Sequence, residues 1–487
     1  MAIISVQFLL FLGAVFLLYF LLPLKLRPYV LLAASMYFYA CFDWVGFLYL
    51  GTTTVTTFAA AQLAHRAKQA GNLRQAKIWL GSAVVLNAGI LILVKFLAST
   101  LALVGSLLQV SVPELRIPAA LGIAFYTMQS ISYCVDVYRG KYLPEKSFWK
   151  YLLYMSFFPI IMQGPISRYD QLAHQVVTPH RFSFDRMKAG CSLMLWGMFQ
   201  KMVVADRAAM LVNQVFGKYE EYAGFQILIA VFLYTIQLYA DFSGCVDISR
   251  GVSQVLGIEL ARNFNAPYFA DSIQDFWRRW HISLSSWFKD YIYIPLGGSR
   301  KGTLRKYGNL MAVFFVSGLW HGVGMHYMVW GAMQGIFQIV GAVTQKARFR
   351  LYDRLGINRE GWLYRLGRWA VTFALVNLSW LVFRADGCMV ALRMLWSALT
   401  VFNPQILTNG AVFAMGLDKK DFLVLAAGIV LLFAVNYLQQ KGSVREKLER
   451  CPFWIRYPVY IFAVLSVLVL GVYGPGFDQS QFLYMQF

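Results

Sequence analysis

Long apolar runs alternate with short basic segments along most of this chain. A run of about twenty apolar residues is long enough to cross a lipid bilayer as a helix. We therefore predict helical spans in the apolar stretches at residues 3–22, in a run ending at 42, and at 44–63, 78–110, 119–137, 191–216, 225–240, 327–343, 369–383, 422–438 and 457–472.

Two further apolar segments, residues 151–162 and 389–401, are too short to cross comfortably. The first ends in Gln163-Gly164-Pro165, and interrupted segments of this kind occur at membrane depth where they are buried in protein or line a cavity. We predict an all-α polytopic fold with about ten to thirteen helical segments around a central funnel, including re-entrant or interfacial helices. No repeat or soluble domain is evident, so one membrane domain over 1–487 is expected.

Composition supports a membrane protein. Of the 487 residues 59% are hydrophobic and only 14% are charged, with a mean hydropathy of +0.54, which excludes a soluble globular chain. The formal net charge of +21 comes from Lys and Arg clusters between the apolar runs, which fits the positive-inside rule better than nucleic-acid binding. By that rule the basic segments face the cytoplasm, and both termini lie outside. The six scattered cysteines predict neither a disulfide framework nor a zinc site.

Polar and ionisable residues concentrate between Asp275 and Gly324. If residues 276–291 form one helix, His281 falls on the same face as Trp277, Trp280 and the other aromatics. A flexible basic loop at 297–302 follows. Farther along, His321 stands between Trp320 and Gly322, where an imidazole would be partly desolvated and glycine would let a substrate come close.

A histidine on an apolar face is more often a core residue than a catalyst, but an ionisable side chain inside a membrane protein is a functional candidate by default. We rank His321 first, His281 second and His326 as weaker. Intramembrane carboxylates need partners, so Asp241 or Asp247 is expected to pair with a nearby arginine: Arg250, Arg278 or Arg279. Asn263, Asn265 and Tyr268 would line the same cavity.

The stretch FWRRWHISLSSWFKDYIYIPLGG (276–298), followed by GLWHG (318–322), resembles the signature of the membrane-bound O-acyltransferase family. It is most similar to the branch that acetylates exported bacterial polysaccharides such as alginate. The segments at 121–140, 237–249 and 263–277 are also similar to that branch, so the resemblance covers nearly the whole chain.

The resemblance implies an O-acyltransferase in which His321 is catalytic and His281 assists in positioning or proton transfer. It also implies an acyl, most simply acetyl, donor that is a cytoplasmic thioester, either acetyl-coenzyme A or an acylated carrier protein, with no bound cofactor. Arg300 and Lys301 would then meet the phosphates of the donor, although each is equally well an ordinary cytoplasmic basic residue. The substrate-binding or funnel residues would be Trp280, Trp320, Asp241, Asn265, Arg278, Arg279, Arg300 and Lys301.

The C-terminal segment 475–487 is rich in aromatic residues and resembles the ending of this branch. In the related D-alanylation system a similar motif is thought to supply an acyl-carrying tyrosine, and the matching residue here is Tyr484. The tail would otherwise be an amphipathic plug of the outer funnel. The resemblance further implies a bacterial inner-membrane location, an extracytoplasmic acetyltransferase partner similar to SGNH hydrolases, a polysaccharide acceptor, and no nucleic-acid partner.

Other functions compete with this interpretation. Within acyltransferases, the alternatives are D-alanyl transfer to teichoic acid and acylation of a lipid. A transporter could use Asp241, Asp247 and the histidines as a proton relay, but paired halves typical of many transporters are not visible. A metalloenzyme is disfavoured because the chain has no HExxH motif or Cys/His cluster. The loop at 297–303 is not a P-loop, since it lacks the required lysine before Thr303.

Overall fold

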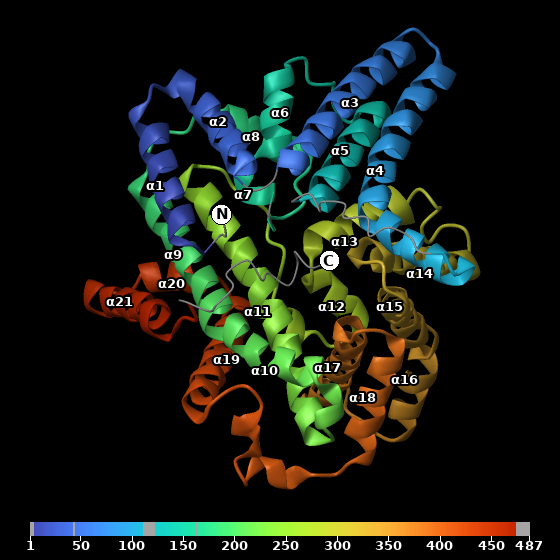
Figure 1. Cartoon of the computed structure of the whole chain (residues 1–487), viewed down its shortest axis with the longest axis vertical. Coiled ribbons are helices and arrows are strands. Elements are labelled where there is room, and N and C mark those ends of the chain that lie inside the picture. Colours follow the sequence, from blue (N-terminus) through green and yellow to red (C-terminus); the bar gives the residue numbers. More distant parts are fainter. Residues whose placement is uncertain (1–3, 42–43, 111–121, 162, 474–487) are drawn as a thin grey trace. The chain divides into compact units, whose positions relative to one another are not determined.

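The computed structural model describes residues 4–41, 44–110, 122–161 and 163–473 (Figure 1). Every helix or strand assigned within those ranges is a helix, which confirms the all-α prediction. Five of these helices are long and apolar enough to cross a membrane. They contain the segments Leu73–Ala98, Phe225–Val255, Trp362–Arg384, Lys419–Gln439 and Phe453–Leu470. The chain is therefore a multi-pass membrane protein.

The chain divides into two compact units. The first comprises Met1–Met194 and Val246–Ala261, and the second comprises Leu195–Cys245 and Arg262–Phe487. A single domain over residues 1–487, with the tail at 475–487, stays a prediction. The tail lies outside the described residues, which end at Tyr473.

The first unit consists of helices that follow the predicted spans closely. Helices α3, α4 and α5 pack against one another (Figure 1). The short helices α6 and α7 replace the predicted segment at 151–162, and all four residues of α7 are buried. The elements of this unit are α1 (Val6–Leu21), η1 (Leu24–Leu26), α2 (Arg27–Ala40), α3 (Trp44–Gln69), α4 (Leu73–Leu108), α5 (Ile123–Arg139), α6 (Phe148–Ser156), α7 (Phe158–Ile161), α8 (Tyr169–Val177) and the first part of α9 (Phe184–Met198).

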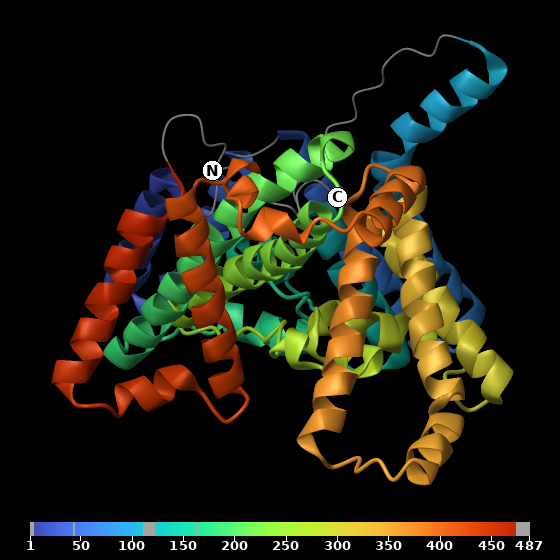
Figure 2. The same ribbon diagram turned by 90° about the horizontal axis from the view of Figure 1, so that it is seen from below.

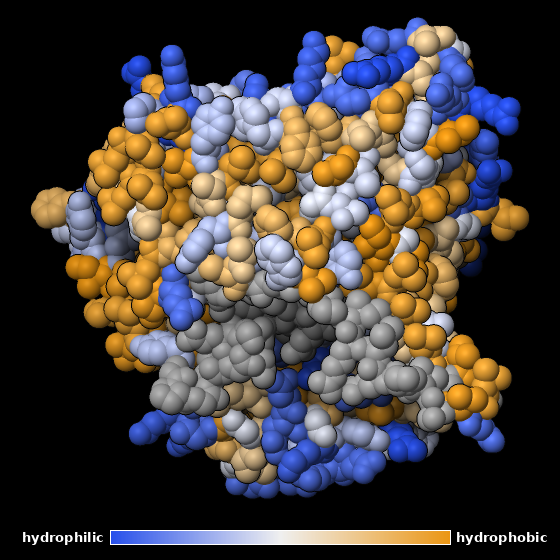
Figure 3. Space-filling model, turned by 45° about the horizontal axis from the view of Figure 1, so that its top comes forward, coloured by the Kyte–Doolittle hydropathy of each residue, from blue (hydrophilic) through white to orange (hydrophobic). Residues whose placement is uncertain are grey.

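Large apolar side chains cover much of the surface of the helices in the first unit. In α4 only 11% of the most apolar window is buried inside the protein, and Val85, Ile92 and Leu93 are more than half exposed. Hydrophobic side chains are also prominent on the face drawn in Figure 3. Such exposure is unfavourable in water but expected where a helix faces lipid tails.

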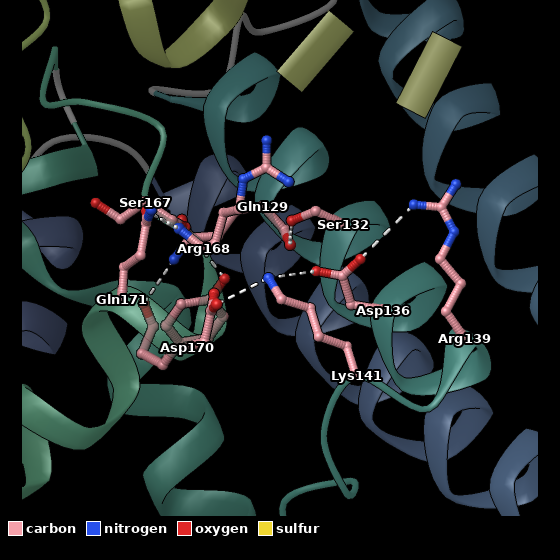
Figure 4. A network of polar contacts seen from close by, with 10 residues as sticks. Gln129, Ser132, Asp136, Arg139, Lys141, Ser167, Arg168, Asp170 and Gln171 are labelled. Carbon is pink, nitrogen blue, oxygen red and sulfur yellow. Dashed lines mark hydrogen bonds and ion pairs between the residues drawn. The ribbon is translucent and has the colours of Figure 1, made fainter. Parts of the chain in front are cut away.

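A polar network closes the loop that follows α5 (Figure 4). The Lys141 ammonium lies 3.4 Å from the Asp136 carboxylate and 2.7 Å from that of Asp170, and Arg139 lies 3.9 Å from Asp136. Partial burial opposes the charged form of Lys141, but the Asp170 and Asp136 carboxylates outweigh it and raise the pKa of Lys141. The Lys141 ammonium therefore links α8 to the end of α5.

Helices α9 and α11 (Phe225–Val255) approach closely at two glycines of the first unit. A Cβ atom at Gly190 would lie 2.6 Å from the carbonyl oxygen of Gly251, and a Cβ atom at Gly251 would lie 2.6 Å from that of Gly190. Small residues of this kind allow helix backbones to approach in a membrane, where packing replaces the hydrophobic effect.

We expect Gly251→Ala to lower the free energy of unfolding by about 1–3 kcal/mol, because the added methyl group must push the two backbones apart. Thermal melting of the purified protein in detergent measures this loss. Gly81→Ala in α4 is the matched control, since nothing lies within 4 Å of its Cβ position. Equal melting temperatures for Gly251→Ala and Gly81→Ala would contradict the close helix contact.

The second unit holds the predicted reaction centre and a large aromatic core. Trp330, Trp380 and Tyr234 are among its most buried side chains. Helix α20 joins α19 to α21 (Figure 2), and both of these long helices pack on η2, a π-helical segment. The elements are η2 (Phe199–Ala205), α10 (Asp206–Gly217), η3 (Tyr219–Glu221), η4 (Pro267–Phe269), α12 (Ile273–Arg279), α13 (Ile282–Phe288), η5 (Lys289–Tyr293), α14 (Thr303–His321), α15 (Met325–Val343), α16 (Gln345–Arg354), α17 (Trp362–Arg384), α18 (Cys388–Thr400), η6 (Pro404–Leu407), η7 (Ala411–Ala414), α19 (Lys419–Gln439), α20 (Val444–Glu449) and α21 (Phe453–Leu470).

Glycines also set the spacing of α14 and α15. A Cβ atom at Gly331 would lie 2.3 Å from the carbonyl oxygen of Phe314, and one at Gly318 would lie 2.4 Å from that of Tyr327. The two helices can therefore lie almost backbone to backbone. This contact fixes the end of α14, where His321 is the last helical residue, against the first turns of α15.

Candidate active site

The predicted single helix over residues 276–291 is wrong, because the chain breaks at Trp280 and His281. Helix α12 ends at Arg279 and α13 begins at Ile282. His281 adopts the left-handed conformation, with φ 45° and ψ 54°. Histidine enters this region more readily than most residues, but it still costs about 1–3 kcal/mol, and such strain is often found at functional sites.

Asn263 supplies the contacts that compensate for the break. Its backbone carbonyl accepts the N–H of Ile282 at 2.9 Å, and its side-chain oxygen accepts the N–H of Ser283 at 3.0 Å and the Ser283 hydroxyl at 2.9 Å. The same loop donates the Asn265 N–H to the Arg279 carbonyl at 2.9 Å. A residue well before the helices therefore satisfies the donors at the start of α13, as helix ends require.

His281 is buried, as expected, although its backbone differs from the prediction. Its ring is 1% exposed and lies edge-on to Phe242, with 4.8 Å between centroids. It also contacts the indole of Trp320, with 6.1 Å between the ring centroids. Phe242 comes from α11 and Trp320 from α14, so His281 lies where three parts of the second unit meet.

His321 occupies the next position in the same aromatic cluster. It is 6% exposed, and its ring centroid lies 4.8 Å from that of Trp320, 5.1 Å from that of Trp330 and 5.3 Å from that of Phe383. All three contacts are perpendicular, at 82° to 89°. Trp320 therefore touches both histidines, and the structure brings the two predicted reaction-centre residues together through this one indole.

Gly322 does not leave open space for a substrate beside His321. A Cβ atom at Gly322 would lie 2.3 Å from the Tyr327 ring, so the glycine makes room for that side chain. His326 stands on α15 rather than on another face of the same helix, and its ring contacts Tyr327 with 4.1 Å between centroids. The turn through Gly322–Gly324 thus separates His321 from His326.

The remaining predicted residues fall into core, surface and ion-paired groups. Trp280 is a core residue, 4% exposed, with its ring stacked 5.4 Å from Phe276 and its centroid 5.3 Å from that of Trp380. Asn265 and Arg278 are exposed. Arg279 pairs with Asp275 of its own helix at 2.8 Å. Their predicted roles as funnel residues stay predictions.

Arg300 and Lys301 lie in an exposed loop before α14. The loop is held by Asn309 of α14, whose side-chain amide donates to the carbonyl of Gly298 at 2.9 Å and to that of Leu296 at 3.3 Å. Gly297, Gly298 and Gly302 have positive φ angles, which glycine adopts without strain. The two basic side chains are thus presented to solvent on a fixed backbone.

Asp241 pairs with a residue that the sequence interpretation did not consider. Its carboxylate lies 2.6 Å from the ammonium of Lys201, which lies 2.7 Å from the carboxylate of Asp206. All three side chains are at most 5% exposed. In the first unit, Asp247 pairs with Arg250 at 2.9 Å, and this confirms the predicted carboxylate–arginine pairing.

Lys201 was detectable in the sequence, because it interrupts the apolar run at 191–216 together with Asp206 and Arg207. Charged residues inside a span are functional or paired by default. Lys201 sits in the π-helical segment η2, an element that is rare and frequent at functional sites. Beside it, Ser243 of α11 donates its hydroxyl to the side-chain oxygen of Gln200.

The arrangement provides two buried imidazoles among aromatic rings, with a buried cation between two carboxylates in the same unit. An imidazole can take a proton from a hydroxyl and return it to a leaving group near neutral pH. Within the described ranges, no group of three or more His, Cys, Asp or Glu side chains is placed to hold a metal ion. Tyr484 lies outside the described residues.

Comparison with known proteins gives a consistent picture. Residues 144–383 match the family model described as MBOAT, membrane-bound O-acyltransferase family. A Pseudomonas aeruginosa protein named "Probable alginate O-acetylase AlgI" is 34% identical over 426 residues, which covers 86% of this chain and 78% of that protein. The peptidoglycan O-acetyltransferase of Helicobacter pylori is 31% identical over 436 residues, covering 84% and 79% of the two chains.

A more distant relative is the teichoic acid D-alanyltransferase of Bacillus subtilis. It is 27% identical over 246 residues, which covers 46% of this chain and 59% of that protein. The matched family model includes both histidines, the loop at Arg300 and the buried Lys201 cluster. From the membrane helices, the aromatic histidine cluster and these matches, the chain belongs to the membrane-bound O-acyltransferase family.

Proposed function

We propose that this O-acyltransferase takes an acetyl group from a cytoplasmic thioester and passes it across the bacterial inner membrane for O-acetylation of an exported or cell-wall polysaccharide. The observation that carries the proposal is the buried pair His281 and His321 around Trp320, in a chain 34% identical to an alginate O-acetylase. The donor is acetyl-coenzyme A or an acetylated carrier protein, and the reaction needs no bound cofactor.

In the first transfer, His321 accepts the proton of the Tyr484 hydroxyl as its oxygen bonds to the thioester carbon. The carbon–sulfur bond breaks, and the leaving thiolate takes the proton from the imidazolium. In the second transfer, His321 accepts the proton of an acceptor hydroxyl, which attacks the tyrosyl ester. The tyrosinate leaves and is protonated by the same imidazolium, so both steps balance. His281, which contacts Trp320, positions the aromatic cluster around the base.

The donor approaches from the side of the basic loop. Arg300 and Lys301 are exposed there, and Arg305 and Lys306 follow in the first turn of α14. Four cations on a short segment suit the phosphates of coenzyme A or of a carrier-protein arm. By the positive-inside rule this loop faces the cytoplasm, and the two termini face the outside.

On the outer side the acetyl group passes to a separate extracytoplasmic acetyltransferase of the SGNH-hydrolase type. This partner recognises the polysaccharide. A second candidate is D-alanyl transfer to teichoic acid, favoured by the 27% identity to the Bacillus subtilis enzyme. It is weaker because that match covers 46% of this chain, against 86% for the alginate relative.

The role of Tyr484 is tested by peptide mass spectrometry after the purified protein has been incubated with acetyl-coenzyme A. We expect an acetyl adduct on Tyr484 in the wild type and its complete absence in Tyr484→Phe, because the phenyl ring has no nucleophilic oxygen. His321→Ala should also lack the adduct. Tyr473→Phe, at the end of the described chain, is the control that should keep it.

The outcomes separate the alternatives. Unchanged polysaccharide acetylation in cells that carry Tyr484→Phe would reject the covalent step. Consumption of the thioester with no adduct on any residue would mean direct transfer to a bound acceptor. An adduct formed from a D-alanyl thioester but not from an acetyl thioester would favour the teichoic acid alternative.

A further inference from the structure

One buried side chain beside His321 has a hydrogen-bond donor that no described residue satisfies. Trp330 of α15 is 0% exposed, and its indole nitrogen has no hydrogen-bond partner within the described part of the chain. An indole N–H can only donate, and leaving such a group unpaired in the interior costs about 1–3 kcal/mol. Because an unpaired buried donor is this costly, we expect a bound substrate to supply the acceptor of the Trp330 N–H.

Neighbouring indoles show that acceptors are available to tryptophans in this unit. Trp277 donates its indole N–H to the side-chain oxygen of Gln334 at 3.1 Å, one turn along α15 from Trp330. Trp369 donates to the carbonyl of Tyr268 at 2.7 Å. The Trp277 and Trp330 rings are in contact, with 6.0 Å between centroids. Trp277 and Trp369 therefore find acceptors within the protein, whereas the indole of Trp330 has none among the described residues.

Trp330 is also directly next to the proposed base. Its ring centroid lies 5.1 Å from that of His321 and 5.1 Å from that of Phe383, and the Trp330 and His321 planes are perpendicular, at 89°. The next residue, Gly331, packs against the Phe314 carbonyl at the tight α14–α15 contact. The indole is thus held on a rigid backbone, which is what an electrostatically preorganised group requires.

Two more donors without acceptors lie near the same rings. Arg384, which follows Phe383, has a buried Nε with no hydrogen-bond partner among the described residues, while its Nη2 donates to the side-chain oxygen of Asn213 at 2.9 Å. Its guanidinium lies over the Phe216 ring at 5.4 Å from the centroid. Tyr234, whose ring lies 5.9 Å from Phe216, is 0% exposed and its hydroxyl also lacks a partner among the described residues. The Arg384 guanidinium and the Tyr234 side chain therefore both contact Phe216, and Arg384 follows Phe383, whose ring contacts His321.

We propose that the Trp330 indole N–H binds the carbonyl oxygen of the acyl group and stabilises the negative charge that this oxygen develops during transfer. The inference rests on the proposed function and deepens it. When the hydroxyl oxygen bonds to the thioester carbon, the carbonyl electron pair moves to the oxygen, where the indole donates. When the carbon–sulfur bond breaks, the pair returns and the thiolate leaves. Trp330 exchanges no proton.

The test compares tryptophan analogues at position 330 in the full-length protein, with acetyl-coenzyme A as the donor and membranes that carry the polysaccharide as the acceptor. β-(3-benzothienyl)alanine replaces the indole N–H by sulfur in the same shape, and 4-fluorotryptophan keeps the N–H. We expect the benzothienyl variant to lose about 10²–10³-fold in kcat for thiol release with little change in KM, since a lost oxyanion donor acts on the transition state. The fluorotryptophan variant should stay near wild type. A purely structural role would treat both analogues alike.

Trp380→Phe is the matched control. Trp380 is 2% exposed, and its ring stacks on that of Trp330 with 5.7 Å between centroids and lies in the packed core. Its loss should therefore affect packing and leave the kcat of correctly folded protein within a few-fold of wild type. Melting temperatures and elution profiles confirm that equal amounts of folded protein are compared.

An active wild type together with a fully active benzothienyl variant would overturn the inference and leave the proposed function standing. An equal loss of kcat in Trp380→Phe would also overturn it, because the effect would then not be specific to the donor beside His321. A wild type that releases no thiol from acetyl-coenzyme A or from an acetylated carrier protein would overturn the proposed function itself, and the inference with it.

Discussion

Replacing His321 by alanine is expected to lower acetyl transfer by about 10²–10⁴-fold, the usual contribution of a positioned general base. The imidazole is 6% exposed and enclosed by Trp320, Trp330 and Phe383, so no water-borne base can readily take its place. The measurement is the ester-linked acetate that mild alkali releases from the exported polysaccharide of cells carrying the variant. We expect that acetate to fall to the background level of cells that lack the protein.

His326→Ala is the matched control for this prediction. His326 is a half-buried histidine in the first turn of the next helix and contacts Tyr327 rather than the aromatic rings around His321. We expect the His326 variant to keep most of the acetylation. If both variants lose acetylation to the same extent at equal protein levels, the assignment of the base to His321 is wrong.

The second large effect concerns stability rather than chemistry. Lys201→Met is expected to lower the free energy of unfolding by about 3–5 kcal/mol, because it leaves two buried carboxylates without their cation. Asp206 and Asp241 lie 2.7 Å and 2.6 Å from the lysine ammonium and are almost fully buried. Thermal unfolding of the purified variant, followed by the loss of monodisperse protein, measures the change.

Two further variants make this prediction specific. Lys201→Met combined with Asp206→Asn and Asp241→Asn removes all three charges and should recover much of the loss, since a neutral cluster needs no counter-ion. Lys218→Met is the surface control, because Lys218 is 57% exposed and lies 3.7 Å from Glu221, so it should change stability by less than about 1 kcal/mol. A Lys201→Met protein as stable as the Lys218→Met protein would contradict the buried triad.

The spans could be predicted from the sequence because their signal is local. Length and apolar composition decide whether a segment crosses a bilayer, and the predicted spans at 369–383 and 422–438 lie inside α17 and α19. The prediction stopped α11 at residue 240, fifteen residues before its end at Val255, because Asp241 and Ser243 resemble a boundary. Lys201 and Gln200, which lie about forty residues away, satisfy these polar groups inside the helix.

The break at His281 could not be predicted from periodicity. Residues 276–291 have continuous helical spacing, and nothing in that stretch ends a helix. The break depends on Asn263, whose backbone and side chain satisfy Ile282 and Ser283 from outside the stretch. The spacing of residues in the sequence correctly placed His281 among aromatic rings. The ring partners of the two histidines come from three other helices: Phe242 contacts His281, and Trp330 and Phe383 contact His321.

The central claim is that the histidine cluster catalyses the cleavage of a thioester. The most direct measurement is the release of free coenzyme A from acetyl-coenzyme A by purified protein in lipid bilayers, followed with a thiol-reactive dye for wild type and His321→Ala. With no acceptor present, we predict a burst of about one thiol per wild-type molecule as the protein is acylated, and no release above the uncatalysed rate by the variant. Proton-coupled solute uptake by the same vesicles with no thiol release would contradict it, and would identify the charged residues as part of a transport pathway instead.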